Sequence, residues 1–180
     1  MVAASPHAAA SALIVRVPEA EDRVGELRLR FDASARLGVP AHITVLFPFM
    51  PPHLITQAVL RQAEHALAAV PSFSFRLQSV ARFAATAYLA PEPAAPFVAL
   101  TAALSHAFPG FAPFHGEHAA VVPHLTVANG NADEAALAAT ELARLMRSLG
   151  PIDATCSRVG LFGNASGAWR EMHAFALPRR

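Results

Sequence analysis

Two short runs, HITV at residues 42–45 and HLTV at residues 124–127, share the pattern H-x-T-V. Apolar runs of this length are typical of strands, in which side chains alternate between two faces, so each His points the same way as its Thr. Where two such pairs face each other, one imidazole takes a proton, the other gives one, and the hydroxyls hold phosphate oxygens. The runs therefore predict metal-free phosphodiester chemistry, with His42, Thr44, His124 and Thr126 as the reacting groups.

The surroundings of both runs favour strands. Pro40 and Pro123 each lie within two residues of a motif His, and proline biases the neighbouring backbone toward extended geometry. A simpler interpretation is that each His is an ordinary hydrogen-bonded strand residue.

The spacing of the motifs indicates an internal duplication. The two histidines are 124 − 42 = 82 residues apart, and the same offset carries the segment from Phe73 onto Thr155 and the segment from Thr86 onto Ala168. Upstream the repeat fails, because 12–17 has a strand pattern whereas 94–99 opens a helix. Two similar lobes packed about a pseudo-twofold axis would bring both motifs to that axis.

Hydrophobic periodicity predicts an alternation of helices and strands. Strands are expected at 12–17, around each motif (the second at 119–128), and at 73–83, 86–90, 152–162 and 168–177. Helices are expected at 19–31, 53–69 and 95–108, and from 131 to about 149, where Asn131 and Glu134 resemble a capping box.

Composition bounds the class of protein. A chain of 180 residues with 54% hydrophobic and 15% charged residues is typical of a single globular domain, here 1–180. No run approaches the roughly 18 apolar residues that span a bilayer, and the stretch up to Val17 lacks the basic leader of a signal peptide, so we expect a cytoplasmic protein without membrane contact. The single cysteine, Cys156, excludes an internal disulfide and is expected to be a buried structural thiol.

Charge narrows the possible partners and reactions. A formal net charge of +1 argues against an extended nucleic-acid footprint and favours a small phosphorylated nucleotide or an RNA end as the ligand. We also expect the protein to be a monomer. All 14 basic residues are arginines. Without lysine, ligation through a lysyl-nucleotide intermediate, P-loop chemistry and Schiff-base formation are excluded.

The motifs and their order resemble a known family. The segments PAHITVLFPF, FRLQSVARF, AYLAPEP and VVPHLTVAN, with a closing hairpin that carries Trp169, resemble the two-histidine (2H) phosphoesterase superfamily in its 2′-5′ RNA ligase-like and cyclic phosphodiesterase branch. The resemblance covers nearly the whole chain and implies an α+β fold. In that fold, two pseudo-symmetric lobes of antiparallel sheet, each backed by helices, enclose a central groove.

The resemblance also implies an activity. Similar proteins act without metal or other cofactor on 2′,3′-cyclic phosphates or 2′-5′ bonds of RNA ends and nucleotides. Carried onto this chain, His42 and His124 are the general acid and base, with the assignment between them open, and Thr44 and Thr126 donate hydrogen bonds to the phosphate. An imidazole pKa near 6.5 predicts a bell-shaped rate profile.

Other residues are weaker candidates for substrate binding. Phe47, Phe49 and Tyr88 have rings that can stack on a base, although aromatic residues in such runs more often belong to the core. Arg36 and Arg170 are candidate phosphate contacts, although solvated surface arginines are the commoner case. Relatives often carry a basic residue near the second motif, and none occurs here between Pro109 and Arg144.

Two other hypotheses compete with this one. One keeps the fold and makes the protein a non-catalytic module that binds a nucleotide or an RNA end. The other places a metal at His115, Glu117, His118 and His124, although H-x-E-H has no standard ligand spacing. Metal analysis, and turnover of a 2′,3′-cyclic nucleotide in the presence of a chelator, distinguish the three.

Overall fold

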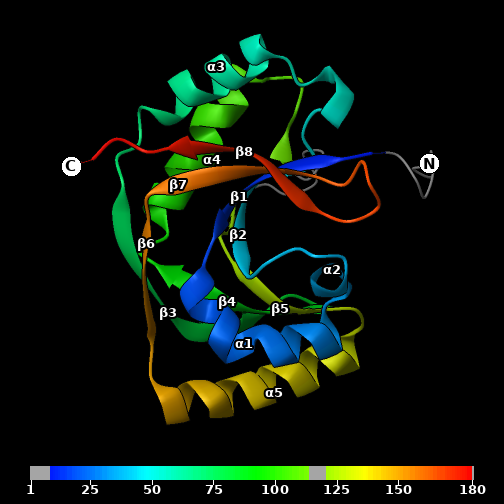
Figure 1. Ribbon diagram of the computed structural model, residues 1–180. Helices are drawn as coiled ribbons and strands as arrows, with labels where there is room; N and C mark the ends of the chain where they lie inside the picture. Colours follow the sequence, from blue (N-terminus) through cyan, green and yellow to red (C-terminus); the bar gives the residue numbers. More distant parts are fainter. Residues whose placement is uncertain (1–8, 114–120, 180) are drawn as a thin grey trace.

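The computed structural model describes residues 9–113 and 121–179 and contains one eight-stranded antiparallel sheet (Figure 1). The strands are β1 (Ser11–Arg16), β2 (His42–Leu46), β3 (Phe73–Arg82), β4 (Thr86–Glu92), β5 (Leu125–Asn129), β6 (Ile152–Cys156), β7 (Arg158–Gly163) and β8 (Arg170–Ala176). The helices are α1 (Pro18–Phe31), α2 (Ala33–Arg36), the 3₁₀ turn η1 (Pro52–Leu54), α3 (Gln57–Leu67), α4 (Ala95–Ala107) and α5 (Ala132–Leu149). The expected α+β fold is thereby confirmed.

The sheet order is symmetric about the two motif strands. The order β6-β3-β4-β5-β2-β1-β7-β8 places β5 and β2 at the centre, so that β4 on one side corresponds to β1 on the other, and β3 corresponds to β7. The predicted offset of 82 residues relates β3 to β7 correctly. It wrongly relates β4 to β8, because β8 lies at the sheet edge and the counterpart of β4 is the upstream strand β1.

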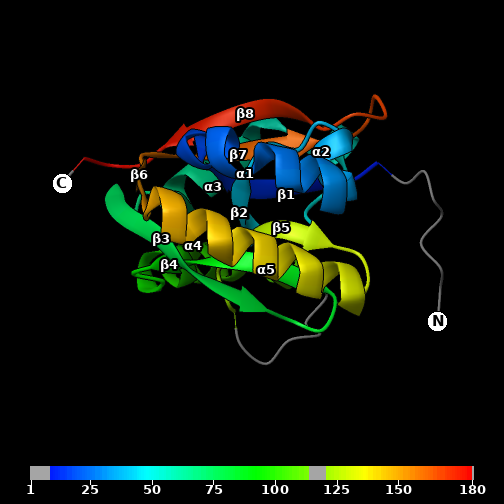
Figure 2. The same cartoon turned by 90° about the horizontal axis from the view of Figure 1, so that it is seen from below.

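The helices follow the same symmetry. Helix α1, which follows β1, packs on β5, and α4, which follows β4, packs on β2. Helices α1 and α5 lie side by side against one half of the sheet, as Figure 2 shows, whereas α3 packs on α4 and on β8. The two related units are β1-α1-β2 and β4-α4-β5. The helix of each unit covers the motif strand of the other unit, and these contacts join the two halves of the sheet.

Several element boundaries differ from expectation. The strand expected at 152–162 is two strands, because the chain breaks at Ser157: β6 pairs with β3 at one sheet edge and β7 pairs with β1 in the other half. The helix expected at 53–69 begins only at Gln57, where the Thr56 hydroxyl accepts a hydrogen bond from the Val59 N–H. The second motif strand begins at Leu125, and the first residues of its expected range lie outside the described residues.

A single large hydrophobic cluster joins both halves of the sheet to the helices. Cys156 belongs to it and is 1% exposed, and burial raises the pKa of its thiol to about 12, which agrees with a structural thiol. The N-cap half of the expected capping box is also present, since the Asn131 side chain accepts a hydrogen bond from the Glu134 N–H. Over the described ranges, the helices are too short or too polar to cross a membrane.

Candidate active site

The two motif strands are neighbours in the sheet. Ile43 pairs with Leu125 in antiparallel register, and both side chains are fully buried in the core. Continued by one residue in each direction, this register sets His42 opposite Thr126, and Thr44 opposite His124, on the other face of the sheet. All four of these side chains are partly buried. The sheet therefore brings both His-Thr pairs to one place, as the sequence predicts.

Both histidines are held by the same backbone contact. His42 Nδ1 lies 2.7 Å from the Pro40 carbonyl oxygen, and His124 Nδ1 lies 2.7 Å from the Val122 carbonyl oxygen. A carbonyl only accepts, so each Nδ1 carries the proton of that hydrogen bond. Each Nε2 is then a proton acceptor when its ring is neutral and a donor when its ring is protonated.

A charged network around the buried Arg28 lies behind the first motif. Arg28 of α1 is 1% exposed, and its Nη2 donates to Asp32 Oδ2 at 3.0 Å and to the Val39 carbonyl at 3.1 Å. One Glu21 oxygen lies 3.8 Å from Arg28 Nη1, and the other accepts the Ala41 N–H at 2.6 Å. These bonds hold the backbone on both sides of Pro40, at Val39 and Ala41. The network therefore positions the Pro40 carbonyl, which orients the His42 imidazole.

The environment of His42 favours its neutral form. Burial lowers the pKa of His42 from 6.5 to about 4; the charges of Arg28 and His124 lower it too, and the Pro40 hydrogen bond and the Asp32 carboxylate only partly oppose them. His42 is therefore neutral near pH 7, with its Nε2 ready to accept a proton.

The second motif has aromatic surroundings instead. The Phe83 ring meets the His124 ring edge-on with centroids 5.3 Å apart, and the Tyr88 ring lies 5.2 Å from it. Phe83 is 41% exposed, whereas Tyr88 is buried beside Thr126, its partner in the β4–β5 register. Tyr88 thus lies beside the second motif as a packing partner of the imidazole, with little surface left for a nucleobase.

The remaining predicted substrate contacts fall in different places. Phe47 is partly buried, with the Trp169 ring at a centroid distance of 6.2 Å, and packs on an apolar cluster with Ile14, the register partner of Thr44. Phe49 is buried in the core against Phe108, 5.1 Å away, so it offers no stacking surface.

The two predicted arginines are not tied to the motifs by any described contact. Arg36 donates to the Leu29 carbonyl at 2.7 Å, and Arg170 opens β8 opposite Gly163 at the outer part of the sheet. Sequence reasoning missed a third arginine, Arg16, which is the register partner of His42 on β1. The sequence did contain a signal for Arg16, because it is the one charged residue in the apolar run ALIVRV.

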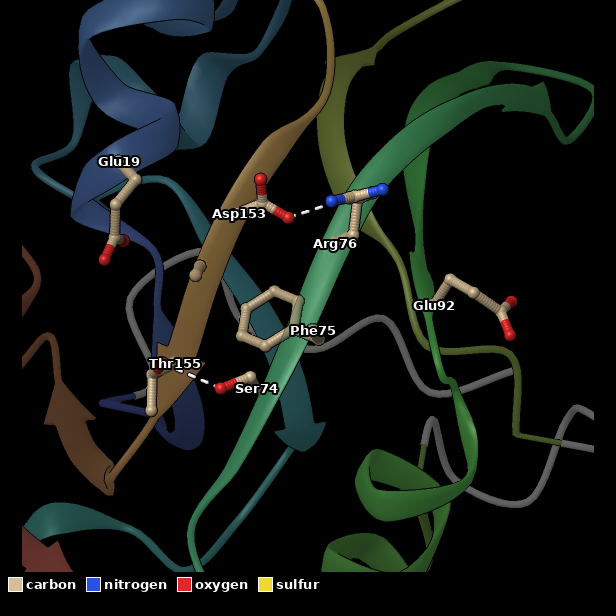
Figure 3. Close-up of a pocket in the computed structure, with 8 residues that line it drawn as sticks. Glu19, Ser74, Phe75, Arg76, Glu92, Asp153 and Thr155 are labelled. Atoms are coloured by element: carbon tan, nitrogen blue, oxygen red, sulfur yellow. Dashed lines mark hydrogen bonds and ion pairs between the residues drawn. The ribbon is translucent and has the colours of Figure 1, made fainter.

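A hollow of about 520 Å³ lies elsewhere, between β3, β6 and the start of α1 (Figure 3). Arg76 and Asp153 form an ion pair across it at 2.7 Å, and Ser74 bonds Thr155 at 3.2 Å. Because no motif residue lines it and these side chains satisfy one another, this hollow does not belong to the phosphodiester site.

The hypothetical metal site cannot be placed, since His115, Glu117 and His118 lie outside the described residues. Within 9–113 and 121–179, no group of three or more His, Cys, Asp and Glu side chains has the arrangement of a metal site.

Two H-x-T motifs on paired strands, at the centre of a symmetric antiparallel sheet, define a class of protein. Comparison with known families identifies the same class. The model of the 2′-5′ RNA ligase superfamily matches residues 17–168, and the chain belongs to this family. No curated protein matches the chain.

Solved structures share the fold at low identity. Escherichia coli LigT complexed with 3′-AMP has a TM-score of 0.56 at 14% identity and covers 96% of this chain and 99% of its own. The protein TT0787 of Thermus thermophilus has a TM-score of 0.57 at 14% identity, covering 95% and 99%. At such identities the likeness shows the fold alone.

Proposed function

We propose that the protein is a metal-independent phosphodiesterase that acts on 2′,3′-cyclic phosphates or 2′-5′ linkages of nucleotides or RNA ends. The observation that carries the proposal is the Ile43–Leu125 register, which brings two imidazoles with equivalent Nδ1 hydrogen bonds to neighbouring strands. A phosphate over β2 and β5 is then within reach of two Nε2 atoms and two hydroxyls.

We assign the proton transfers from the environment of His42, which favours its neutral form. Neutral His42 accepts a proton from the attacking water through Nε2, as the water oxygen bonds to phosphorus. His124, in its protonated form, donates from Nε2 to the ribose oxygen as the phosphorus–oxygen bond of the ring breaks. The negative charge of a bound phosphate raises the basicity of His42, which brings its pKa closer to the working pH.

The threonines act on the charge of the phosphate. Donation from Thr44 and Thr126 to the non-bridging oxygens stabilises the charge that accumulates there in the transition state. Support for nucleotide ligands also comes from the neighbours, since E. coli LigT is described in complexes with 3′-AMP, ATP, NADP+ and phosphate.

The deciding experiment is hydrolysis of 2′,3′-cyclic AMP and of 2′-5′ ApA in the presence of EDTA. We expect wild-type turnover to survive the chelator, and His42→Ala and His124→Ala each to lower kcat/KM on the order of 10²–10⁴-fold, the usual contribution of a positioned acid or base. Thr44→Val and Thr126→Val should each cost on the order of tenfold to a thousandfold, as for lost oxyanion donors.

Matched controls at His65 and Thr140, both exposed on helices, should leave turnover unchanged. Full activity in either motif His variant would refute the mechanism. If nucleotides bind but nothing is turned over in any protein, the non-catalytic binding module is the correct alternative.

A further inference from the structure

We propose that Arg16 binds a second phosphate of the substrate, one position along from the phosphate that reacts. This inference rests on the proposed function and narrows its substrate class. It favours RNA ends or nucleotides that carry an additional phosphate over nucleosides with a single one.

The position of Arg16 follows from the sheet register. Arg16 on β1 pairs with His42 on β2, so both side chains project from the same face. A phosphate that touches both motif histidines lies between β2 and β5, and β1 is the next strand outward, on the side away from β5. With strands about 4.8 Å apart, the β1 backbone at Arg16 lies about 7 Å from that phosphate, measured across the sheet, which is within the length of an arginine side chain. The direction in which the side chain extends therefore decides which group of the ligand it meets.

Within the part of the chain that the structure describes, the contacts of Arg16 leave its donors available. Its Nη1 lies 3.9 Å from Glu171 Oε2, which exceeds hydrogen-bond length, and the side chain is 42% exposed. Arg158 is bound much more firmly to the same carboxylate, since its Nη2 lies 3.0 Å and 2.9 Å from the two Glu171 oxygens. Glu171 is thus committed to Arg158, and this three-residue cluster retains one positive charge.

The position of Gly160 shows that Glu171 lies over the same face of the sheet as the motif threonines. Gly160 pairs with Ile14, which pairs with Thr44, so a side chain at Gly160 would project on the same face as Thr44. A Cβ built there would lie 3.1 Å from Glu171 Oε2 and 2.8 Å from the Phe162 ring. The carboxylate that draws Arg16 outward therefore lies over this face, and the missing side chain at Gly160 leaves room for it.

The direction of Arg16 also argues against a role on the reacting phosphate. Its guanidinium leans toward Glu171, over β7, and hence away from β5 and His124. Arginine binds phosphate through two parallel N–H donors, which the loose contact at 3.9 Å does not occupy.

Calorimetric titration with adenosine 3′-monophosphate and adenosine 3′,5′-bisphosphate tests the proposal without requiring turnover. We expect wild type to bind the bisphosphate on the order of tenfold or more tightly, the usual effect of a charge-assisted hydrogen bond. Arg16→Gln should remove most of this preference while changing monophosphate affinity less than about twofold, and Arg16→Lys should restore part of it.

Two further variants sharpen the test. Arg61→Gln removes the same charge from exposed α3 and should leave the preference intact. Glu171→Gln removes the competing carboxylate and should strengthen bisphosphate binding without affecting the monophosphate.

The outcomes separate the two proposals. An unchanged preference in Arg16→Gln, equal loss for both ligands, or no nucleotide binding by wild type would each overturn the second-phosphate site. If the preference behaves as expected while the cyclic and 2′-5′ substrates are never turned over, the site is upheld and the proposed activity fails.

Discussion

The first and second motifs make the same backbone hydrogen bond but lie in different surroundings. Behind His42 lies the buried ion pair of Arg28 and Asp32, joined at the surface by Glu21, whereas His124 packs against the rings of Phe83 and Tyr88. Two nearly identical tetrapeptides thus have unequal environments. A general acid and a general base require unequal proton affinities, and the packing behind each ring is able to provide them.

The comparison is most strongly tested by removing Arg28. Arg28→Met leaves Asp32 buried without its cation, and we expect a loss of about 3–5 kcal/mol in the free energy of unfolding, measured with urea. Met keeps the apolar stem of the side chain, so most of the loss reports the guanidinium and its hydrogen bonds. The double variant Arg28→Met/Asp32→Leu should recover part of it.

Arg30 on the same helix supplies the matched control. It pairs with Glu141 at 2.8 Å on the exposed surface, so Arg30→Met should cost at most about 1 kcal/mol. NMR of the folded variants adds a second readout: the ring resonances of His42 should move in Arg28→Met, and those of His124 should not. Equal costs for the two arginines, or equal shifts at the two histidines, would mean that the network does not distinguish the motifs.

The pH dependence of stability gives the next largest effect. The pKa of His42 is about 4 in the folded protein and near 6.5 when unfolded, so the native state resists protonation. Stability from this site is therefore complete above pH 6.5 and is lost as pH falls toward 4, by about 3 kcal/mol in total.

Urea unfolding at pH 7, 5.5 and 4.5 measures this loss. His42→Gln should flatten the decline relative to wild type, and His65→Gln, at an exposed position on α3, should not. Parallel pH curves for wild type and His42→Gln would contradict the pKa of His42 and remove the basis for naming it the proton acceptor.

The sequence predicted what local pattern determines and missed what the packing of distant elements determines. Alternation of side chains predicted that His42 and Thr44 share a face, because that depends only on strand geometry. The positions of Arg16 and Arg28 relative to the motif depend on which strand and which helix pack beside β2. Arg16 pairs with His42 although it lies 42 − 16 = 26 residues before it in the sequence. For the same reason the sequence did not predict the break at Ser157, since both flanking strands are rich in apolar residues and their different pairing partners are distant in sequence.

The smallest expected effect concerns the aromatic side of the comparison. Phe83 is partly exposed and contacts His124 through the edge of its ring, so Phe83→Ala should lower kcat/KM by about twofold to tenfold, equivalent to the roughly 0.5–1.5 kcal/mol of an aromatic pair. Phe83→Leu keeps apolar volume without the ring and separates the two contributions. Because a ring shifts the resonances of its neighbours, the His124 signals should move in both variants.

Phe47→Ala is the counterpart in the first half, since Phe47 packs on Trp169 and no contact with a histidine is described for it. It should leave the signals of His124 in place. Movement of the His42 signals in Phe83→Ala, as large as that of His124, would show that the two rings respond as one unit. The idea that charged residues set the properties of His42 and aromatic residues those of His124 would then be wrong, although the register between β2 and β5 would be unaffected.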